Sequence, residues 1–231
     1  MVIVFVVGFV FLGVGSGGLD LQSLVQDVFG KKGSSGTSIA KAQKNVNEHP
    51  RSAAAYKQLS DAYRRKGQTQ KAIQALQNYT ALAPKDVTGL QQLGRLELST
   101  ATTAQQQFQI AYFHQQQSSV ASTLTGGTKI GQALAQDPLT QAQSSQSSQA
   151  VQQTSTAYQQ ALTQTLDTFR QIAKLQPSVL NYVELAGVAL QFNDTTSALK
   201  AYRQALAVKN VDPATRRQLR ARIKQLQPAG K

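Results

Sequence analysis

Cysteine and tryptophan are absent from the 231-residue sequence, and histidine and acidic residues are scarce, with two and eleven copies. Without cysteine the chain has no disulfide, no thiolate zinc site and no thiol nucleophile. The acidic residues stand singly and lack the spacing of a calcium-binding loop. His49 precedes a proline and His114 lies in a glutamine-rich run, so neither stands beside a partner for acid–base or metal chemistry. We therefore expect no catalytic residue, no metal site and no cofactor, and we do not expect an enzyme.

The charge of the chain is strongly unbalanced. Basic residues outnumber acidic ones by 24 to 11, which gives a net charge of +13 and an isoelectric point of about 10.1. This balance favours acidic proteins, nucleic acid or other anionic polymers as partners. The length suits one folded domain of ordinary size together with a short membrane segment.

Two prolines, Pro50 and Pro84, stand 34 residues apart and enclose a regular pattern of aromatic, apolar and small residues. The pattern consists of Tyr56, Leu59, Ser60, Tyr63, Gly67, Ala72, Leu76 and Tyr79. The first four lie along one side of a helix, and the last three lie along one side of a second helix. Gly67 lies between them, where a residue in the left-handed conformation can end the first helix. The pattern predicts two antiparallel helices joined by a short turn.

A second copy of this pattern follows 126 residues later with the same offsets. Asn193 stands where the first copy has Gly67, and asparagine also tolerates the left-handed conformation. The matching residues are Tyr182, Leu185, Ala186, Ala198, Tyr202 and Ala205. Over residues 38–227 the chain resembles tetratricopeptide repeat (TPR) proteins of the membrane-anchored bacterial type. The resemblance implies an all-α fold, an α-solenoid of helical hairpins, and a function in binding proteins.

The first residues of the chain are strongly apolar, and residues 2–14 carry no charge. As a helix they would span about 20 Å, whereas the hydrocarbon core of a bilayer is about 30 Å thick. A signal-peptide core, a buried helix and a membrane anchor that begins upstream of Met1 are the alternatives. We expect an anchor over residues 1–18 and a flexible Gly/Ser linker over residues 19–38.

The expected localisation is therefore that of a single-pass membrane protein. By the positive-inside rule, the nearest basic residues would place the repeat domain in the cytoplasm; they are Lys31, Lys32, Lys41 and Lys44. The resemblance to anchored bacterial repeat proteins favours the extracytoplasmic side, and this is the side that we expect.

A long helical hairpin is expected between the two repeat copies. From Leu90 onward the apolar residues keep helical spacing, and neither proline nor glycine interrupts them after Gly94. This pattern predicts one helix over residues 87–118 and a second over residues 148–175. The segment between them, 119–147, is rich in Ser, Thr and Gln, and we expect it to be mainly flexible.

The resulting domain organisation interrupts the repeat array. It has TPR units at 39–100, a hairpin insertion at 101–175, a TPR unit at 176–212 and a basic capping helix at 213–227. Glutamine tracts at 105–107 and 115–117 leave self-association through the insertion open as an alternative.

The first helix of each pair lines a concave groove in TPR proteins. The residues expected on that face here are Lys57, Asp61, Arg64, Arg65, Gln91 and Arg95. Family members that clamp a carboxy-terminal carboxylate have Lys and Asn at the positions of Lys57 and Asp61. Since Asp61 would repel a carboxylate, the resemblance implies binding of an extended or helical segment of a protein partner instead.

The last helix is expected to begin at Pro213, because Asp212 and Pro213 form a favourable helix start. Its outward side carries Arg216, Arg217, Arg220 and Lys224. One interpretation is a helix that caps the array and keeps its end in water. The alternative is salt-sensitive binding of an anionic polymer, either nucleic acid or an envelope polyanion. Nucleic acid is the less expected partner, because no aromatic platform accompanies the charge. The main hypothesis is a membrane-tethered scaffold or adaptor that binds proteins through its concave surface.

Overall fold

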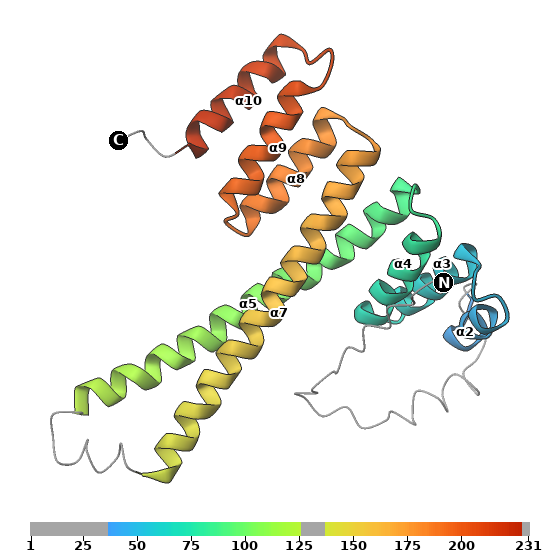
Figure 1. Ribbon diagram of the computed structural model, residues 1–231. Helices are drawn as coiled ribbons and strands as arrows, with labels where there is room; N and C mark the ends of the chain where they lie inside the picture. Colours follow the sequence, from blue (N-terminus) through green and yellow to red (C-terminus); the bar gives the residue numbers. More distant parts are fainter. Residues whose placement is uncertain (1–36, 126–136, 228–231) are drawn as a thin grey trace, which may run out of the picture.

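The computed structural model describes residues 37–125 and 137–227, with the backbone alone over 118–125. These residues form eight α-helices and no strand (Figure 1). In chain order they are α2 (Ile39–Glu48), α3 (Ala53–Arg65), α4 (Thr69–Leu82), α5 (Val87–Thr125), α7 (Pro138–Leu175), α8 (Val179–Gln191), α9 (Thr195–Ala207) and α10 (Pro213–Leu226). Each helix packs against its neighbour in the sequence, as in a helical-repeat array.

The helix pairs α3–α4 and α8–α9 share one turn geometry. Gly67 and Asn193 have positive φ angles of 69° and 61°, as the sequence predicts. In the first turn the N–H of Gln68 donates to the Tyr63 carbonyl at 3.0 Å, and in the second the N–H of Asp194 donates to the Ala189 carbonyl at 2.9 Å. Both are the hydrogen bond of a Schellman motif, which satisfies a free carbonyl at the end of the helix. The fold is therefore an all-α arrangement with TPR-like helical hairpins.

The repeat positions lie inside or at the edge of the core. Leu59, Ala72, Leu76, Leu185, Ala186, Ala198, Tyr202 and Ala205 are buried, while Tyr56, Tyr63 and Tyr182 are partly buried. One buried cluster joins α2, α3 and α4, a second joins α4 to α5, and the largest joins α5 and α7 to α8, α9 and α10. The long helices α5 and α7 thus connect the two repeat pairs.

Helices α5 and α7 have 39 and 38 residues, and their antiparallel pairing forms a long hairpin that extends away from the other helices (Figure 1). Residues at alternating spacings of three and four face the partner helix, as in a coiled coil. On α5 they are Ala101, Ala104, Phe108, Ala111 and Gln115, and on α7 they are Val151, Thr154, Tyr158, Ala161 and Thr165. The Phe108 and Tyr158 rings stack with their centroids 6.1 Å apart.

Both helices of the hairpin are longer than the sequence predicts. Residues 119–125 belong to α5 and residues 138–147 belong to α7, so the tip expected at 119–147 is too long at both ends. The start of α7 has a clear cause, because the Asp137 side chain accepts a hydrogen bond from the Thr140 N–H at 3.2 Å and Pro138 fits the first turn. Residues 126–136 lie outside the described residues.

The membrane prediction is corrected. The expected anchor at 1–18 and residues 19–36 of the expected linker lie outside the described residues. Of the helices in 37–125 and 137–227, none combines the length and the apolar character needed to cross a bilayer. On this finding the assignment as a single-pass membrane protein with an extracytoplasmic repeat domain is wrong.

Candidate functional site

The six residues expected in the groove lie on α3 and α5, and those of α3 already have partners. Lys57 is partly buried, with its Nζ 5.5 Å from the centroid of the Tyr79 ring. Tyr79 donates a hydrogen bond to the Asp86 carboxylate, which raises the pKa of Tyr79 to about 12. The same hydrogen bond lowers the pKa of Asp86, and the Lys57 charge contributes in the same direction.

The other α3 residues are also engaged. Arg64 Nη2 lies 3.1 Å from Asp61 Oδ1 in an ion pair, and Arg65 donates to the Thr37 carbonyl oxygen at 2.9 Å, just before α2. On α5, Gln91 is partly buried and Arg95 is exposed. None of the six lines either of the two hollows described next. The structure therefore does not gather them into one pocket.

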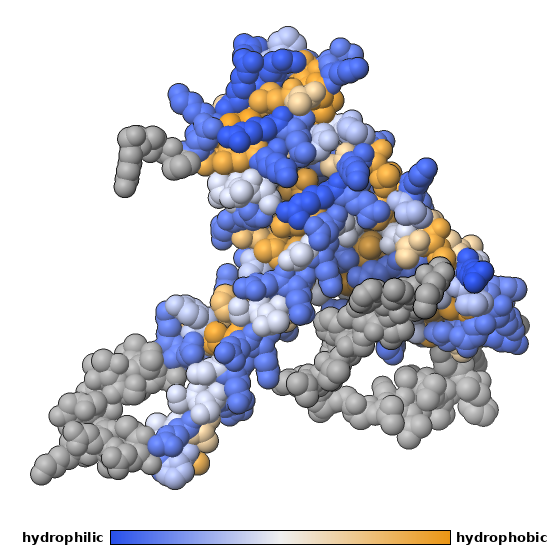
Figure 2. Space-filling model, in the orientation of Figure 1, coloured by the Kyte–Doolittle hydropathy of each residue, from blue (hydrophilic) through white to orange (hydrophobic). Residues whose placement is uncertain are grey.

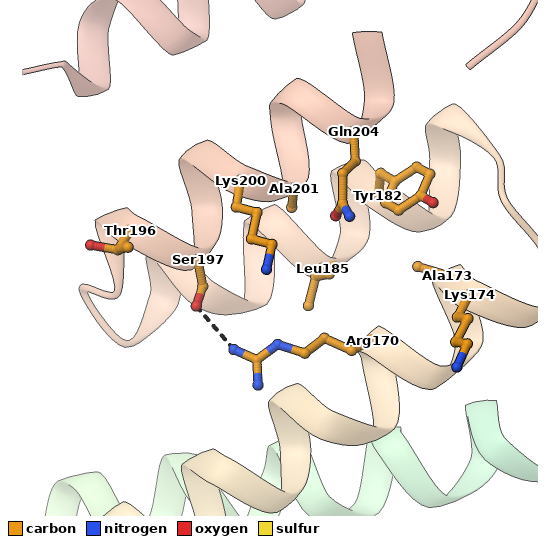
Figure 3. Close-up of a pocket in the computed structure, with 10 residues that line it drawn as sticks. All are labelled: Arg170, Ala173, Lys174, Tyr182, Leu185, Thr196, Ser197, Lys200, Ala201 and Gln204. Atoms are coloured by element: carbon orange, nitrogen blue, oxygen red, sulfur yellow. Dashed lines mark hydrogen bonds between the residues drawn. The ribbon is translucent and has the colours of Figure 1, made fainter. Parts of the chain in front are cut away.

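A hollow of about 550 Å³ lies where α7, α8 and α9 meet (Figure 3). We call it the basic hollow, and its lining residues are Arg170, Ala173, Lys174, Tyr182, Leu185, Thr196, Ser197, Lys200, Ala201 and Gln204. Leu185 and Ala201 are buried and form an apolar floor. Figure 3 shows the Arg170 and Lys200 side chains reaching toward the space in front of Leu185.

The charges of the basic hollow are only partly compensated. Arg170 is held from two sides: its Nη1 lies 2.7 Å from Asp167 Oδ1 and its Nη2 donates to Ser197 Oγ at 3.0 Å. Lys174 and Lys200 are exposed, and neither takes part in an ion pair within the described residues. The hollow thus has one oriented guanidinium and two lysines without an ion pair in its lining, together with an apolar floor.

Local sequence places these cations together. On α7, Arg170 and Lys174 are four residues apart and share one face. The turn into α8 is fixed because the Asn181 Nδ2 donates to the Gln176 carbonyl at 2.7 Å and Ser178 caps the helix. On α9, Lys200 follows a first turn that is capped by Asp194. Sequence reasoning missed this site because it concentrated on the first helix of each pair, and the basic pair on α7 was the available signal.

A second hollow of about 530 Å³ continues along α9. Its lining residues are Thr196, Leu199, Lys200, Arg203, Gln204 and Ala207. Lys200 and Gln204 line both hollows, so the two form one continuous basic surface along α9. The exposed Arg203 belongs to this surface, in addition to the cations of α7.

Helix α10 has the expected two-sided character. Leu219 is buried against the main core, and the Asp212 side chain accepts from the backbone N–H groups of Ala214 and Thr215. The four expected basic residues are all exposed and take part in no ion pair within the described residues; they are Arg216, Arg217, Arg220 and Lys224.

One carboxyl group is buried away from these surfaces. Glu97 on α5 is 4% exposed, and burial raises its pKa to about 7. It accepts hydrogen bonds from Thr168 Oγ1 at 2.6 Å and from Gln77 Nε2 at 3.4 Å. Across residues 37–125 and 137–227, no group of three His, Cys, Asp or Glu side chains is placed to hold a metal ion.

No family model matches the chain, and no curated protein is significantly similar to it. Among solved structures, it is similar to the RS-1 ArsTM double mutant of MamA at 10% identity, with 73% of this chain and 82% of that chain covered and a TM-score of 0.26. It is also similar to TTC0263, a thermophilic TPR protein in Thermus thermophilus, at 15% identity, with 81% and 88% covered and a TM-score of 0.24. The TPR-like character of the fold is seen in the helix pairs and turns of this chain itself.

Proposed function

We propose that this protein is a scaffold that binds a protein partner, and that an acidic segment of the partner occupies the basic hollow. The observation that carries the proposal is that Lys174 and Lys200 line the same hollow as the buried Leu185 and take part in no ion pair within the described residues. A carboxylate can pair with these cations while a neighbouring apolar side chain of the same segment covers Leu185.

The size and chemistry of the basic hollow favour the binding of a peptide over catalysis. Its volume of about 550 Å³ lies in the usual range for ligand pockets of about 300 to 1,000 Å³. Two carboxylates near it are already engaged: Asp167 is paired with Arg170, and Asp194 accepts a hydrogen bond from the Ser197 N–H at 2.9 Å. The lining therefore offers cations and hydroxyl groups for recognition, and it lacks a base for proton abstraction.

The expected groove on α3 and α5 has a smaller part in this proposal. Arg64 is paired with Asp61 and Lys57 stacks on Tyr79, so binding an anion there would have to compete with existing contacts. Arg95 is exposed and takes part in no ion pair within the described residues, so it can contribute to the rim of an interface.

The test is a selection of peptides from a random displayed library on the full chain, followed by affinity measurement with the selected peptides by fluorescence anisotropy. We expect the selected peptides to be rich in Asp and Glu. The double variant Lys174→Glu/Lys200→Glu should weaken their binding at least about tenfold, which corresponds to about 1.4 kcal/mol.

The matched control is Arg216→Glu/Lys224→Glu on α10, which changes the net charge by the same amount on another surface. The affinity of this control variant for the selected peptides should stay within about twofold of the wild-type affinity. General electrostatic attraction depends on the total charge of the chain, whereas ion pairing depends on the position of each charge. Selection of peptides without acidic residues, or equal losses in the two variants, would contradict the proposal.

A second candidate function is salt-sensitive binding of an anionic polymer by α10. It is favoured by four of the five exposed cations of that helix, Arg216, Arg217, Arg220 and Lys224, which take part in no ion pair within the described residues. The two candidate functions use different cations, so the two double variants distinguish them. Lys174→Glu/Lys200→Glu should weaken peptide binding, and Arg216→Glu/Lys224→Glu should weaken binding of an anionic polymer.

A further inference from the structure

The outer part of the hairpin differs from the rest of the molecule in charge. We call residues 105–125 and 138–164 the hairpin arm. Its sequence contains no Asp, Glu, Lys or Arg, although the whole chain carries a net charge of +13. Figure 2 shows the described part of the arm as a mainly hydrophilic surface with small hydrophobic patches. The arm is therefore a neutral projection from a strongly basic body.

The hairpin arm also lacks a core of its own. Among the side chains described, up to residue 117 on α5 and from residue 138 on α7, the last buried residue of α5 is Ala104 and the first buried residue of α7 is Thr165. Between them, every side chain described is partly buried or exposed. Near the tip the contact between the helices becomes polar, with Gln115 Nε2 donating to Ser148 Oγ at 3.3 Å. The seam between the two helices of the arm is thus only partly buried, with the stacked Phe108 and Tyr158 rings in it.

Apolar side chains instead point outward from α5. Ile110 and Phe113 are 58% and 57% exposed, and they share a helix face because they are three residues apart. Tyr112 beside them is 49% exposed, whereas Phe108 is turned inward and stacks on Tyr158. Neighbouring exposed apolar side chains on a polar helix are typical of an interaction surface.

We propose that this face of the hairpin arm binds the arm of a second copy of the chain, with the two arms antiparallel. Pairing two hairpins would give a four-helix arrangement in which Ile110 and Phe113 become core residues. It would add apolar packing to a seam that is only partly buried in a single arm.

The distribution of charge selects a second copy as the occupant. Two chains of net charge +13 repel each other wherever their basic bodies meet, and the neutral arm is the place where they can touch without this cost. In an antiparallel overlap the bodies lie at opposite ends of an arm about 30 Å long, several times the screening length of about 8 Å at physiological salt. An acidic partner would be attracted to the basic body instead.

Sedimentation equilibrium of the full chain tests the proposal. We expect a monomer–dimer equilibrium that 0.5 M salt leaves intact, because the contact is apolar and salt screens the repulsion. Ile110→Gln/Phe113→Gln should weaken dimerisation at least about tenfold. Both positions are exposed, so the variant should fold, and its helical circular dichroism checks this. Leu180→Gln, at a 74% exposed leucine of α8, should leave dimerisation unchanged.

A monomeric wild-type chain at all concentrations would overturn the proposal. So would an association that survives Ile110→Gln/Phe113→Gln. The inference does not depend on the proposed function, since the substituted residues lie outside the basic hollow and peptide affinity is measured separately.

The antiparallel direction has its own test, because the natural chain has no cysteine to interfere. Chains with Gln106→Cys, near the base of the arm, are mixed with chains with Leu139→Cys, near its tip, and oxidised. We expect mixed disulfides between the two chains to exceed those between like chains. A predominance of like-chain products would show parallel arms and contradict the proposed arrangement.

Discussion

Thr168 on α7 donates a hydrogen bond of 2.6 Å to the buried carboxyl group of Glu97 on α5. Glu97 in α5 stands at the repeat position that Tyr63 occupies in α3, since the two residues are 34 positions apart. A polar pair thus stands at the base of the hairpin, where an array of identical repeats would place a core aromatic residue. Its surroundings shift the pKa of Glu97 from an ordinary 4.5 to about 7, with burial as the main cause.

The first prediction concerns the pH dependence that this shift causes. Since the pKa of Glu97 is higher in the folded state, ionisation favours unfolding, and the cost builds up between pH 4.5 and 7. A shift of this size corresponds to about 3 kcal/mol. Glu97→Gln should therefore gain up to about 3 kcal/mol in unfolding free energy relative to the wild type on going from pH 4 to pH 8.

Urea unfolding of both proteins at pH 4, 6 and 8 measures this difference. Glu184→Gln, at an exposed glutamate of α8, controls for the loss of one carboxylate. A Glu97→Gln difference that does not change with pH would mean that the carboxyl group is not buried as described.

Two helical glycines, the buried Gly89 in the first turn of α5 and the exposed Gly187 within α8, are predicted to respond to alanine in opposite ways. A Cβ at Gly89 would collide with the ring of Tyr79, which its hydrogen bond to Asp86 holds in place. A Cβ at Gly187 on α8 would meet no atom within 4 Å. Gly89→Ala should destabilise the fold by about 1 to 3 kcal/mol, while Gly187→Ala should stabilise it by about 0.5 to 1 kcal/mol, because alanine favours a helix interior.

Thermal unfolding of the two variants under one condition measures both effects. Stabilisation by Gly89→Ala would show that the Tyr79 ring moves freely. Destabilisation by Gly187→Ala would show that the α8 surface is covered by another part of the molecule.

Features set by neighbouring residues were predictable from the sequence. The left-handed turns at Gly67 and Asn193 depend on the conformational freedom of one residue each, and both follow from the repeat pattern. The start of α7 was equally local: Asp137 and Pro138 form the same pair as Asp212 and Pro213, so the helix start was recognisable although the prediction overlooked it.

Features that depend on contacts between distant segments could not be predicted from the sequence. Glu97 is buried because α7 brings Thr168 against it from 71 residues away. The basic hollow needs Arg170 to meet Ser197 across the interface of α7 and α9. Neither contact can be read from local spacing. The fold class could therefore be predicted from the sequence, whereas of the candidate site only the basic pair Arg170 and Lys174 on α7 was visible there.

The last prediction concerns α10 and the alternative function. Single-stranded DNA of about 20 nucleotides is a suitable probe, because each phosphate contact on a single strand contributes about −0.7 to the slope of log affinity against log salt. Five cations are exposed on the helix, and Arg222 among them donates a hydrogen bond to Gln225; the other four are Arg216, Arg217, Arg220 and Lys224. If all four contact phosphates, the slope should be about −3. Arg216→Glu/Lys224→Glu should abolish binding, and Lys174→Glu/Lys200→Glu should leave the slope unchanged. Binding that persists in the α10 variant would mean that the polymer binds another surface. The role of α10 would then be to cap the array, because its Leu219 is buried at the end of the core.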